Sequence, residues 1–261
     1  MNLLQYFNME EKDGLARLTL DEEDRQEFLD SLPEDFYLAY ITKSELEKKA
    51  RANKMSVSDF FEQFIIPEIP DYANVRSGDF GEMLCFFLMK NRGHKKGLRL
   101  DGPRKWRWKG DKNKACHGSD VVLFHRHDHK PTNEDRLEVV ESKMKSCRNN
   151  GYHPIQNAFN GAVEDKVKRL AKTLNWIHDR LAKDGKPRLR EAINRYRFVD
   201  ENPTYQKKYH AIAIIDDELV EDEIAKERNL VDDEIEITVV SMKELKSAYE
   251  TTYEAMLTSL Q

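Results

Sequence analysis

Short apolar runs between His117 and Lys143 predict the hairpin on which our functional interpretation depends. Two β-branched runs flank a polar segment, residues 127–135, that is rich in Asp, His and Pro. Alternating strand side chains joined by turn-forming residues are typical of a β-hairpin with a long loop. We therefore expect two antiparallel strands here.

This hairpin is expected to bring acidic residues of its two strands together. With the tip near Pro131–Thr132, Asp120 falls opposite Lys143. Glu141 is then its diagonal neighbour, about 7 Å away. Residues 141 and 143 share a face because strand side chains alternate with a period of two. Two carboxylates at this spacing can hold a divalent ion, although a register slip of one residue would separate them.

Hydrophobic spacing elsewhere predicts alternating helices and strands. The run 208–216 is apolar enough for a central strand. Beyond the hairpin, the expected elements are a strand at 36–42, helices at 44–53, 56–66 and 76–90, a strand within 95–112, a helix at 154–181, a short basic helix at 188–197, strands at 208–216 and 236–242, and a closing helix at 243–260.

The order of these elements predicts an α/β fold, with a mixed β-sheet flanked by helices. The first 35 residues show no clear period, which indicates an irregular or short-strand segment. We therefore divide the chain into an acidic N-terminal extension, residues 1–40, and one domain, residues 41–261.

Composition narrows the class of protein. With 261 residues, of which 35% are charged and 39% hydrophobic, the chain can form one polar globular core. Its longest apolar run, Met83–Met89, is too short to cross a membrane, and its first residues lack the pattern of a secretory signal. Three scattered cysteines favour a reducing cytoplasm over a disulfide framework.

Charge is distributed unevenly along the chain. Residues 1–35 hold eleven acids and three bases, and residues 200–236 hold thirteen acids and four bases. Between them, residues 90–114 hold eleven bases and two acids. This pattern predicts a dipolar molecule with one surface suited to a polyanion.

The helix that is expected to start near Arg76 carries another acidic candidate. Asp79 is a predicted N-cap, and Glu82 follows three residues later, as in a capping box. Glu82 has two interpretations. It is either an acid that complements the helix dipole or a third carboxylate, if the helix packs on the hairpin.

Asp120, Glu141 and Lys143 follow an acid-bearing helix and precede a helix and a strand. This pattern resembles the PD-(D/E)xK nuclease superfamily. Four segments more narrowly resemble the HamA family, the nuclease subunits of Hachiman anti-phage defence systems; the small subunit of the AbpAB defence system is a close competitor. These segments are Arg76–Leu84, Lys105–Trp108, His117–Asp120 and Glu141–Lys143.

The resemblance covers about residues 40–245. It implies a restriction-endonuclease-like fold and a prokaryotic DNA nuclease that works beside a superfamily-two helicase encoded next to it. None of the catalytic positions of the pattern is substituted here. The acidic N-terminal segment is not explained by the resemblance.

Each of these residues has an expected role in phosphodiester hydrolysis. Mg²⁺ or Mn²⁺ takes oxygen ligands, so we assign Asp120, Glu141 and the carbonyl of Ser142 as metal ligands. Lys143 would orient the attacking water and neutralise the scissile phosphate. Glu82 would hold a metal-bound water or a second ion.

Further candidates are less specific. Gln156 is similar to a glutamine that some nucleases of the superfamily place beside the site, although a solvent-facing glutamine at a helix start is the more common reading. A basic segment with interleaved tryptophans suits phosphate contacts and base stacking, and a solvated edge strand is its alternative. Its residues are Arg104, Lys105, Trp106, Arg107, Trp108 and Lys109.

Two other chemistries compete with this assignment. His125, His127 and His129 would share a face in an extended segment, which would suit zinc or nickel, but no cysteine lies at zinc-finger spacing. Cys116 beside His117 could form a thiol nucleophile, but no residue that would orient the histidine is identifiable.

The sequence thus predicts a Mg²⁺- or Mn²⁺-dependent DNA nuclease with little sequence preference, because no recognition module is visible. A non-catalytic DNA-binding or regulatory subunit and a structure-specific repair nuclease on the same fold remain alternatives. The acidic segments 1–35 and 200–236 are candidate contact surfaces for the helicase partner, since opposite charges favour encounter.

Overall fold

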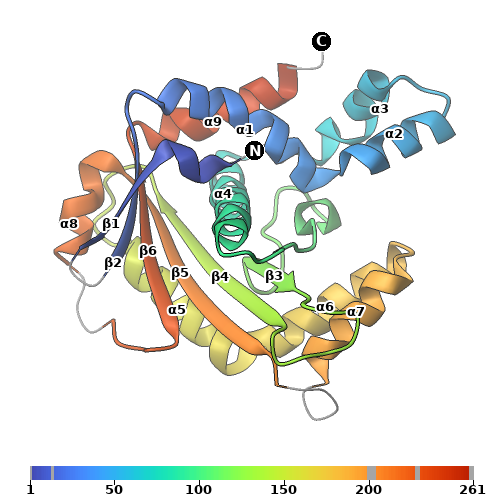
Figure 1. The fold of residues 1–261 in the computed structure, drawn as a ribbon. Helices are drawn as coiled ribbons and strands as arrows, with labels where there is room; N and C mark the ends of the chain where they lie inside the picture. The colour runs from blue at the N-terminus through green and yellow to red at the C-terminus, as the bar shows by residue number, and fades with distance from the viewer. Residues whose placement is uncertain (1, 13–14, 199–203, 227–229, 259–261) are drawn as a thin grey trace.

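Among the residues that the structure describes, six strands form one mixed sheet in the order β1-β2-β6-β5-β4-β3 (Figure 1). The computed structural model describes residues 2–12, 15–198, 204–226 and 230–258. The strands are β1 (Phe7–Lys12), β2 (Leu15–Leu20), β3 (Val121–His125), β4 (Arg136–Lys145), β5 (Gln206–Asp216) and β6 (Ile235–Met242). The four central strands run parallel, and β1 and β3 lie antiparallel to their neighbours at the two edges.

The α-helices follow β2, lie between the later strands or follow the last of them. They are α1 (Arg25–Tyr40), α2 (Lys43–Ala52), α3 (Val57–Phe64), α4 (Ala73–Lys95), α5 (Pro154–Glu164), α6 (Leu170–Lys183), α7 (Pro187–Arg197), α8 (Val220–Ile224) and α9 (Leu245–Thr258). A π-helical segment, Asp165–Arg169, joins α5 to α6. Short 3-10 turns occupy Leu3–Tyr6, Ile66–Glu68, Lys105–Trp108 and Asp217–Leu219. Within the described ranges, no helix is both long and apolar enough to cross a membrane.

Helices cover both faces of the sheet (Figure 1). On one face, α1, α4 and α9 form a layer in which Phe80 and Leu84 pack in the same core as Val140. On the other face, α5 and α6 share a core with Val139 and Ala158. Consecutive residues of β4 face opposite layers because strand side chains alternate. Strand β4 is therefore buried on both sides, which explains the apolar run before Glu141.

The predicted α/β fold with a mixed sheet flanked by helices is confirmed, and its arrangement is consistent with a restriction-endonuclease-like fold. The hairpin, both later strands and the short basic helix are found within two residues of their expected positions. Ser56 caps α3 as expected, accepting a hydrogen bond from the backbone N–H of Asp59 at 3.0 Å. The predicted end of the closing helix at Leu260 lies outside the described residues.

The register of the hairpin differs from the prediction by two residues. Val121 pairs with Val140, which brings Asp120 beside Glu141 instead of Lys143. The predicted tip was one residue too late. Asp135 explains the position of the loop, because its carboxylate accepts hydrogen bonds from the backbone N–H groups of His127 and Thr132. A shift of two residues keeps every side chain on its expected face, so the predicted cluster survives the error.

The strand predicted at residues 36–42 is wrong, because most of this segment is the C-terminal end of α1. Phe28, Leu32 and Phe36 are fully buried and recur every four residues, as on one face of a helix. Taken alone, the run that starts at Phe36 is equally typical of a strand. The helix pattern becomes visible only when the preceding twelve residues are included.

Two predictions around α4 are also wrong. The strand expected within residues 95–112 is a 3-10 turn with a single bridge between Asp101 and Phe124. Asp79 is not an N-cap, since α4 begins at Ala73 and Asp79 lies in its interior. Its carboxylate pairs instead with Lys109 of the basic segment, which folds back onto α4.

The N-terminal residues join the same sheet. Strand β2 pairs in parallel with β6 through residues 16–19 and 238–241, and β1 forms the outer edge beyond it. Helix α1 packs against α9 in the same helical layer as α4. The short strands expected in this acidic segment are therefore present, and they extend the sheet away from the hairpin.

Candidate active site

The ammonium group of Lys143 lies among three oxygen atoms of the hairpin. Its Nζ is 2.5 Å from Glu141 Oε1, 3.4 Å from Asp120 Oδ2 and 3.1 Å from the carbonyl oxygen of Ser142. Glu141, Ser142 and Lys143 belong to β4, and Asp120 directly precedes β3. The predicted side chains are thus brought together, and they surround one positive charge.

Asp120 is held in place by backbone and side-chain contacts. Its Oδ2 accepts a hydrogen bond from the backbone N–H of Ser142 at 2.9 Å. The preceding residue, Ser119, is buried and donates from its hydroxyl to Asp165 Oδ1 at 2.6 Å. The backbone N–H of Ser119 also donates to Thr173 at 3.0 Å. Helix α6 and the π-helical segment therefore fix the chain immediately before Asp120.

Glu141 is buried against α5 and the π-helical segment. One of its oxygens pairs with Lys143, and the other pairs with Arg169. Arg169 Nε also donates to Asp165 Oδ1 at 2.6 Å, so a single guanidinium links Glu141 to the carboxylate that accepts from Ser119. Gly161 of α5 lies directly over this carboxylate: a Cβ there would come within 2.5 Å of the Glu141 side chain.

Glu82 lies on α4, on the opposite face of the sheet from Gly161. Its Oε2 is 2.9 Å from Lys105 Nζ, and the same ammonium donates to the carbonyl of Ser119 at 3.2 Å. Lys105 therefore links Glu82 to the residue before Asp120. Burial raises the pKa of Glu82 to about 8, since the attraction of Lys105 offsets only part of that effect and the charge of Asp120 adds to it.

The other titratable groups of the site are perturbed in a consistent direction. Burial and, after it, the negative charge of Asp120 raise the pKa of Glu141 to about 7, and Lys143 and Arg169 offset only part of this rise. Burial alone would lower the pKa of Lys143, but Asp120 and Glu141 outweigh it and raise that pKa. Lys143 therefore carries its proton at neutral pH. Clustered shifts of this kind are typical of functional sites.

The oxygen donors fit a hard divalent cation. Asp120, Glu141 and the Ser142 carbonyl already converge on one cationic group, and oxygen atoms are the ligands that Mg²⁺ and Mn²⁺ prefer. Within the part of the chain that the structure describes, no three His, Cys, Asp or Glu side chains are grouped for metal binding. Glu82 is therefore not gathered with the other two carboxylates, because Lys105 holds it on α4.

Gln156 lies in the first turn of α5, as expected. Its side-chain amide donates to Asn160 of the same helix at 2.9 Å, on the exposed side of that helix. In the described residues, no bond from Gln156 to a carboxylate of the site is present. Its catalytic role stays a prediction, and its contact is that of a solvent-facing glutamine.

The alternative nucleophile and metal sites are not assembled. Burial raises the pKa of the Cys116 thiol, which disfavours the reactive thiolate. His125 accepts a hydrogen bond from the backbone N–H of Arg99, and His127 pairs with Glu134 at 3.1 Å. The three histidines are not gathered for metal binding among the described side chains.

The basic segment faces the interior more than the solvent. Lys109 pairs with Asp79 at 2.6 Å, and both side chains are buried. Arg107 lies between Glu45 and Asp184 at 2.9 Å from each, and Arg104 contacts Asp101 at 3.2 Å. Trp106 and Trp108 are 1% and 5% exposed. The DNA-binding role of this segment stays a prediction, and its geometry is that of a brace between helices.

Sequence reasoning missed Arg169, Asp165 and Ser119. The spacing of Asp165 and Arg169 is that of an i, i+4 ion pair, which the sequence could have indicated. Their helix, however, is π-helical at this point, and such bulges are frequent at functional sites. The contact of Arg169 with Glu141 depends on the packing of α5 and α6 on the sheet and had no local signal.

A family model described as HamA matches residues 5–256, from the first turn to the last helix. The match includes β1, β2 and α1 as well as the hairpin. The search of curated proteins gives no match.

Proposed function

We propose, from the premise that this chain belongs to the HamA family, that it is a metal-dependent deoxyribonuclease. HamA is a component of a multi-protein anti-phage defence system, so the chain is a defence protein. Hydrolysis of DNA phosphodiester bonds is the activity that best suits both the family and the hairpin site.

One observation carries this proposal: three oxygens converge on a single cationic group. A purely structural ion pair needs one carboxylate, whereas Lys143 contacts Asp120, Glu141 and the Ser142 carbonyl. Burying two carboxylates so close together is unfavourable unless cations compensate them. A non-catalytic DNA-binding subunit would have no need of this arrangement.

Asp120, Glu141 and the Ser142 carbonyl would hold Mg²⁺ or Mn²⁺. When bound, such an ion lowers the pKa of a water molecule and stabilises negative charge on phosphate oxygens. In the part of the chain that the structure describes, no recognition module lies beside the site, which supports hydrolysis with little sequence preference.

Lys143 and Arg169 supply the positive charge of the chain itself. Lys143 keeps its proton at neutral pH, because two carboxylates raise its pKa, and its side chain is 29% exposed. It can therefore reach a phosphate at the surface and orient a water molecule beside it. Arg169 holds Glu141 against Gly161 and acts as a positioning residue.

Regulation by a helicase encoded alongside is the second part of the proposal. A nuclease with little sequence preference endangers the cell that makes it, so its activity has to be restrained. The family belongs to a multi-protein system, which supports a partner as the source of that restraint. In this proposal the chain is active on DNA when the partner allows access to the hairpin site.

Glu141→Gln tests the site because it removes one charge and keeps the shape of the side chain. We expect plasmid nicking in Mg²⁺ to fall by about 10²-fold or more, the usual effect of losing a preorganised charge. Glu138→Gln is the matched control, since Glu138 is a buried acid of the same strand that pairs with His210 instead. The assignment would be contradicted if the parent protein nicks plasmid DNA and the two variants lose this activity, or keep it, to the same extent. Circular dichroism establishes that both variants are folded.

A further inference from the structure

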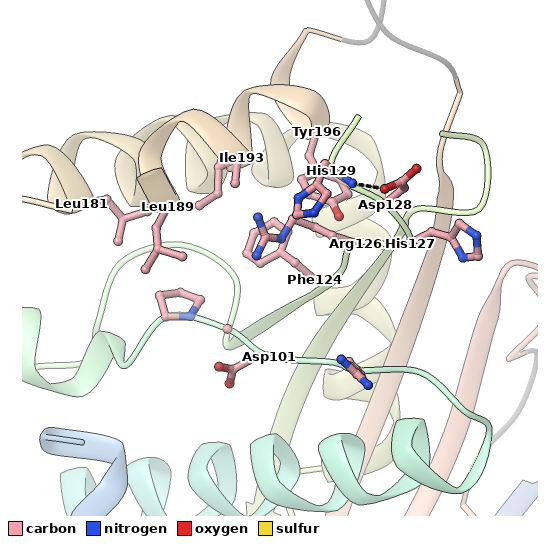
Figure 2. A pocket seen from close by; sticks show the side chains of 14 residues that line it. Asp101, Phe124, Arg126, His127, Asp128, His129, Leu181, Leu189, Ile193 and Tyr196 are labelled. Carbon is pink, nitrogen blue, oxygen red and sulfur yellow. Dashed lines mark hydrogen bonds between the residues drawn. The ribbon is translucent and has the colours of Figure 1, made fainter. Parts of the chain in front are cut away.

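A cavity of about 470 Å³ opens between the β3–β4 hairpin and helices α6 and α7 (Figure 2). Phe124 and Arg126, at the end of β3, line it from the hairpin side. Asp120 lies at the other end of the same strand, roughly 15–20 Å away at about 3.3 Å per residue. None of the residues assigned to the active site lines the cavity.

The inner wall of the cavity is apolar and partly aromatic. Phe124 and Tyr196 contribute two rings whose centroids are 5.0 Å apart. Leu181, Leu189 and Ile193 of α6 and α7 point toward the same space (Figure 2). Leu189 is 47% exposed, so a large apolar side chain remains accessible at the mouth. Such a wall suits the flat face of an aromatic ligand.

Two arginines and two aspartates are among the residues that line the cavity. Arg99 and Arg126 are exposed lining residues, and in the described chain neither guanidinium forms an ion pair. Asp101 lies at the same mouth, but Lys90 at 2.9 Å and Arg104 at 3.2 Å neutralise it from outside the cavity. Two unpaired guanidinium groups beside an apolar wall favour a ligand that carries both an anionic and an aromatic part.

Two more charged groups lie near the rim. Asp128 accepts a hydrogen bond from the backbone N–H of His129 at 2.6 Å, so its carboxylate is partly engaged. The ring of His127 pairs with Glu134 at 3.1 Å. These contacts leave the two arginines as the cationic groups available to a ligand.

We propose that this cavity binds one nucleotide, with its base against Phe124 and Leu189 and its phosphate against Arg99 and Arg126. The volume lies within the range of small-ligand sites. Stacking on an aromatic side chain stabilises any base, and a guanidinium binds phosphate through parallel hydrogen bonds. An apolar anchor from a protein partner would leave both guanidinium groups without an anion.

The same chemistry can come from two sources, a free mononucleotide or an unpaired nucleotide within a DNA strand. Both present one base and one phosphate to the cavity. Base-paired DNA does not, because its bases are stacked inside the duplex. The binding site does not depend on cleavage, so this inference stands apart from the proposed nuclease activity.

Binding measured in EDTA tests the proposal without any contribution from hydrolysis. Isothermal titration would use dAMP, a short single-stranded oligonucleotide and the duplex of the same sequence. Leu189→Glu places a carboxylate at the mouth, and Val57→Glu is its matched control. Val57 is 42% exposed and lies on α3, outside the cavity. We expect Leu189→Glu to weaken binding of dAMP or of the single strand by at least about fivefold, the equivalent of 1 kcal/mol, and Val57→Glu to leave it unchanged.

A second pair of variants tests the phosphate contact. Arg126→Ala should weaken the same binding, whereas Arg188→Ala, an exposed arginine of α7 that does not line the cavity, should not. If Leu189→Glu and Arg126→Ala weaken the binding of dAMP, the site takes a free nucleotide. If they weaken only the binding of the single strand, it takes a nucleotide within DNA. Equal affinities in both matched pairs, or no binding of either probe by the parent protein, would overturn the proposal. Loss of nicking in Glu141→Gln is independent of all these outcomes.

Discussion

At the scale of single residues, the site is defined by how its charges are compensated. Lys143 and Arg169 each take one oxygen of Glu141, which allows this carboxylate to be buried beside Asp120. Such a cluster is stable only in a tightly fixed geometry, because an uncompensated buried charge costs several kcal/mol. The small size of Gly161 is part of that geometry.

Gly161→Ala should therefore impair the site without changing its chemistry. Its Cβ would lie 2.5 Å from Glu141 Cγ, Cδ and Oε1, so the carboxylate or α5 has to shift. We expect a loss of about 1–3 kcal/mol in the free energy of unfolding, as for overpacked cores, and at least a tenfold loss of nicking. Thermal unfolding and plasmid nicking measure the two effects.

Gly78→Ala is the control for this substitution. Gly78 lies in α4, and a Cβ there would meet no atom within 4 Å. Alanine in a helix interior is more favourable than glycine by about 1 kcal/mol, so this variant should be as stable as the parent or more so. Normal nicking by Gly161→Ala would mean that Glu141 does not need its present position.

At the scale of elements, the segment after α4 connects parts of the molecule that are distant in sequence. Lys105 and Lys109 pair with Glu82 and Asp79 of α4. Arg107 reaches Glu45 of α2, which also pairs with Lys186 near the start of α7. The basic residues of this segment, whose composition suits DNA, are therefore largely paired with acidic residues of the protein itself.

The ion pairs of Glu45 can be tested through the pH dependence of protein stability. Burial by itself would raise its pKa, but Lys186 and Arg107 outweigh burial and lower it to about 2. A carboxyl group whose pKa is lower in the folded state stabilises the protein above its unfolded pKa, near 4.5, and loses that contribution as pH falls toward 2. Glu45→Gln should therefore cost no more than about 1 kcal/mol at pH 7, since solvent screens this partly exposed group.

Unfolding by urea at several pH values checks this expectation. The difference between the parent and Glu45→Gln should be largest above pH 5 and should narrow toward pH 3. Glu47→Gln, on the exposed side of the same helix, should show no such dependence. A difference that is constant across the pH range would exclude the proposed ion pairs as its source.

At the scale of the whole molecule, the sheet places the candidate active site and the acidic N-terminal strand far apart. Strand β3, which follows Asp120, forms one edge, and the acidic β1 forms the opposite edge (Figure 1). Glu10 and Glu11 of β1 are exposed there. A partner with a basic DNA-binding surface could bind this edge and leave the hairpin open to DNA.

Charge reversal on β1 tests this arrangement in the complex. Glu10→Lys combined with Glu11→Lys should weaken co-purification with the proposed helicase partner, and the weakening should diminish at high salt. Glu47→Lys combined with Glu62→Lys makes the same change on exposed residues of α2 and α3. If both double variants bind the helicase as the parent does, β1 is not the contact surface.

Much of the architecture was determined by the sequence itself. Period-two and period-four spacing predicted the hairpin and the helices, because these patterns reflect burial of one face, and the continuous apolar run of β5 predicted a central strand. The acid-x-lysine pair of β4 and its shared face with Asp120 were equally local. They survived a register error of two residues, since such a shift does not change the side-chain face.

Tertiary structure alone decided which charges meet. Glu82 and Asp79 read as a helix start, yet both lie inside α4 and pair with Lys105 and Lys109, residues that are distant along the chain. Arg169 gave no signal of its contact with Glu141. Sequence patterns report which residues are buried, but the partner of a buried charge depends on how separate elements pack, and that packing fixes the site.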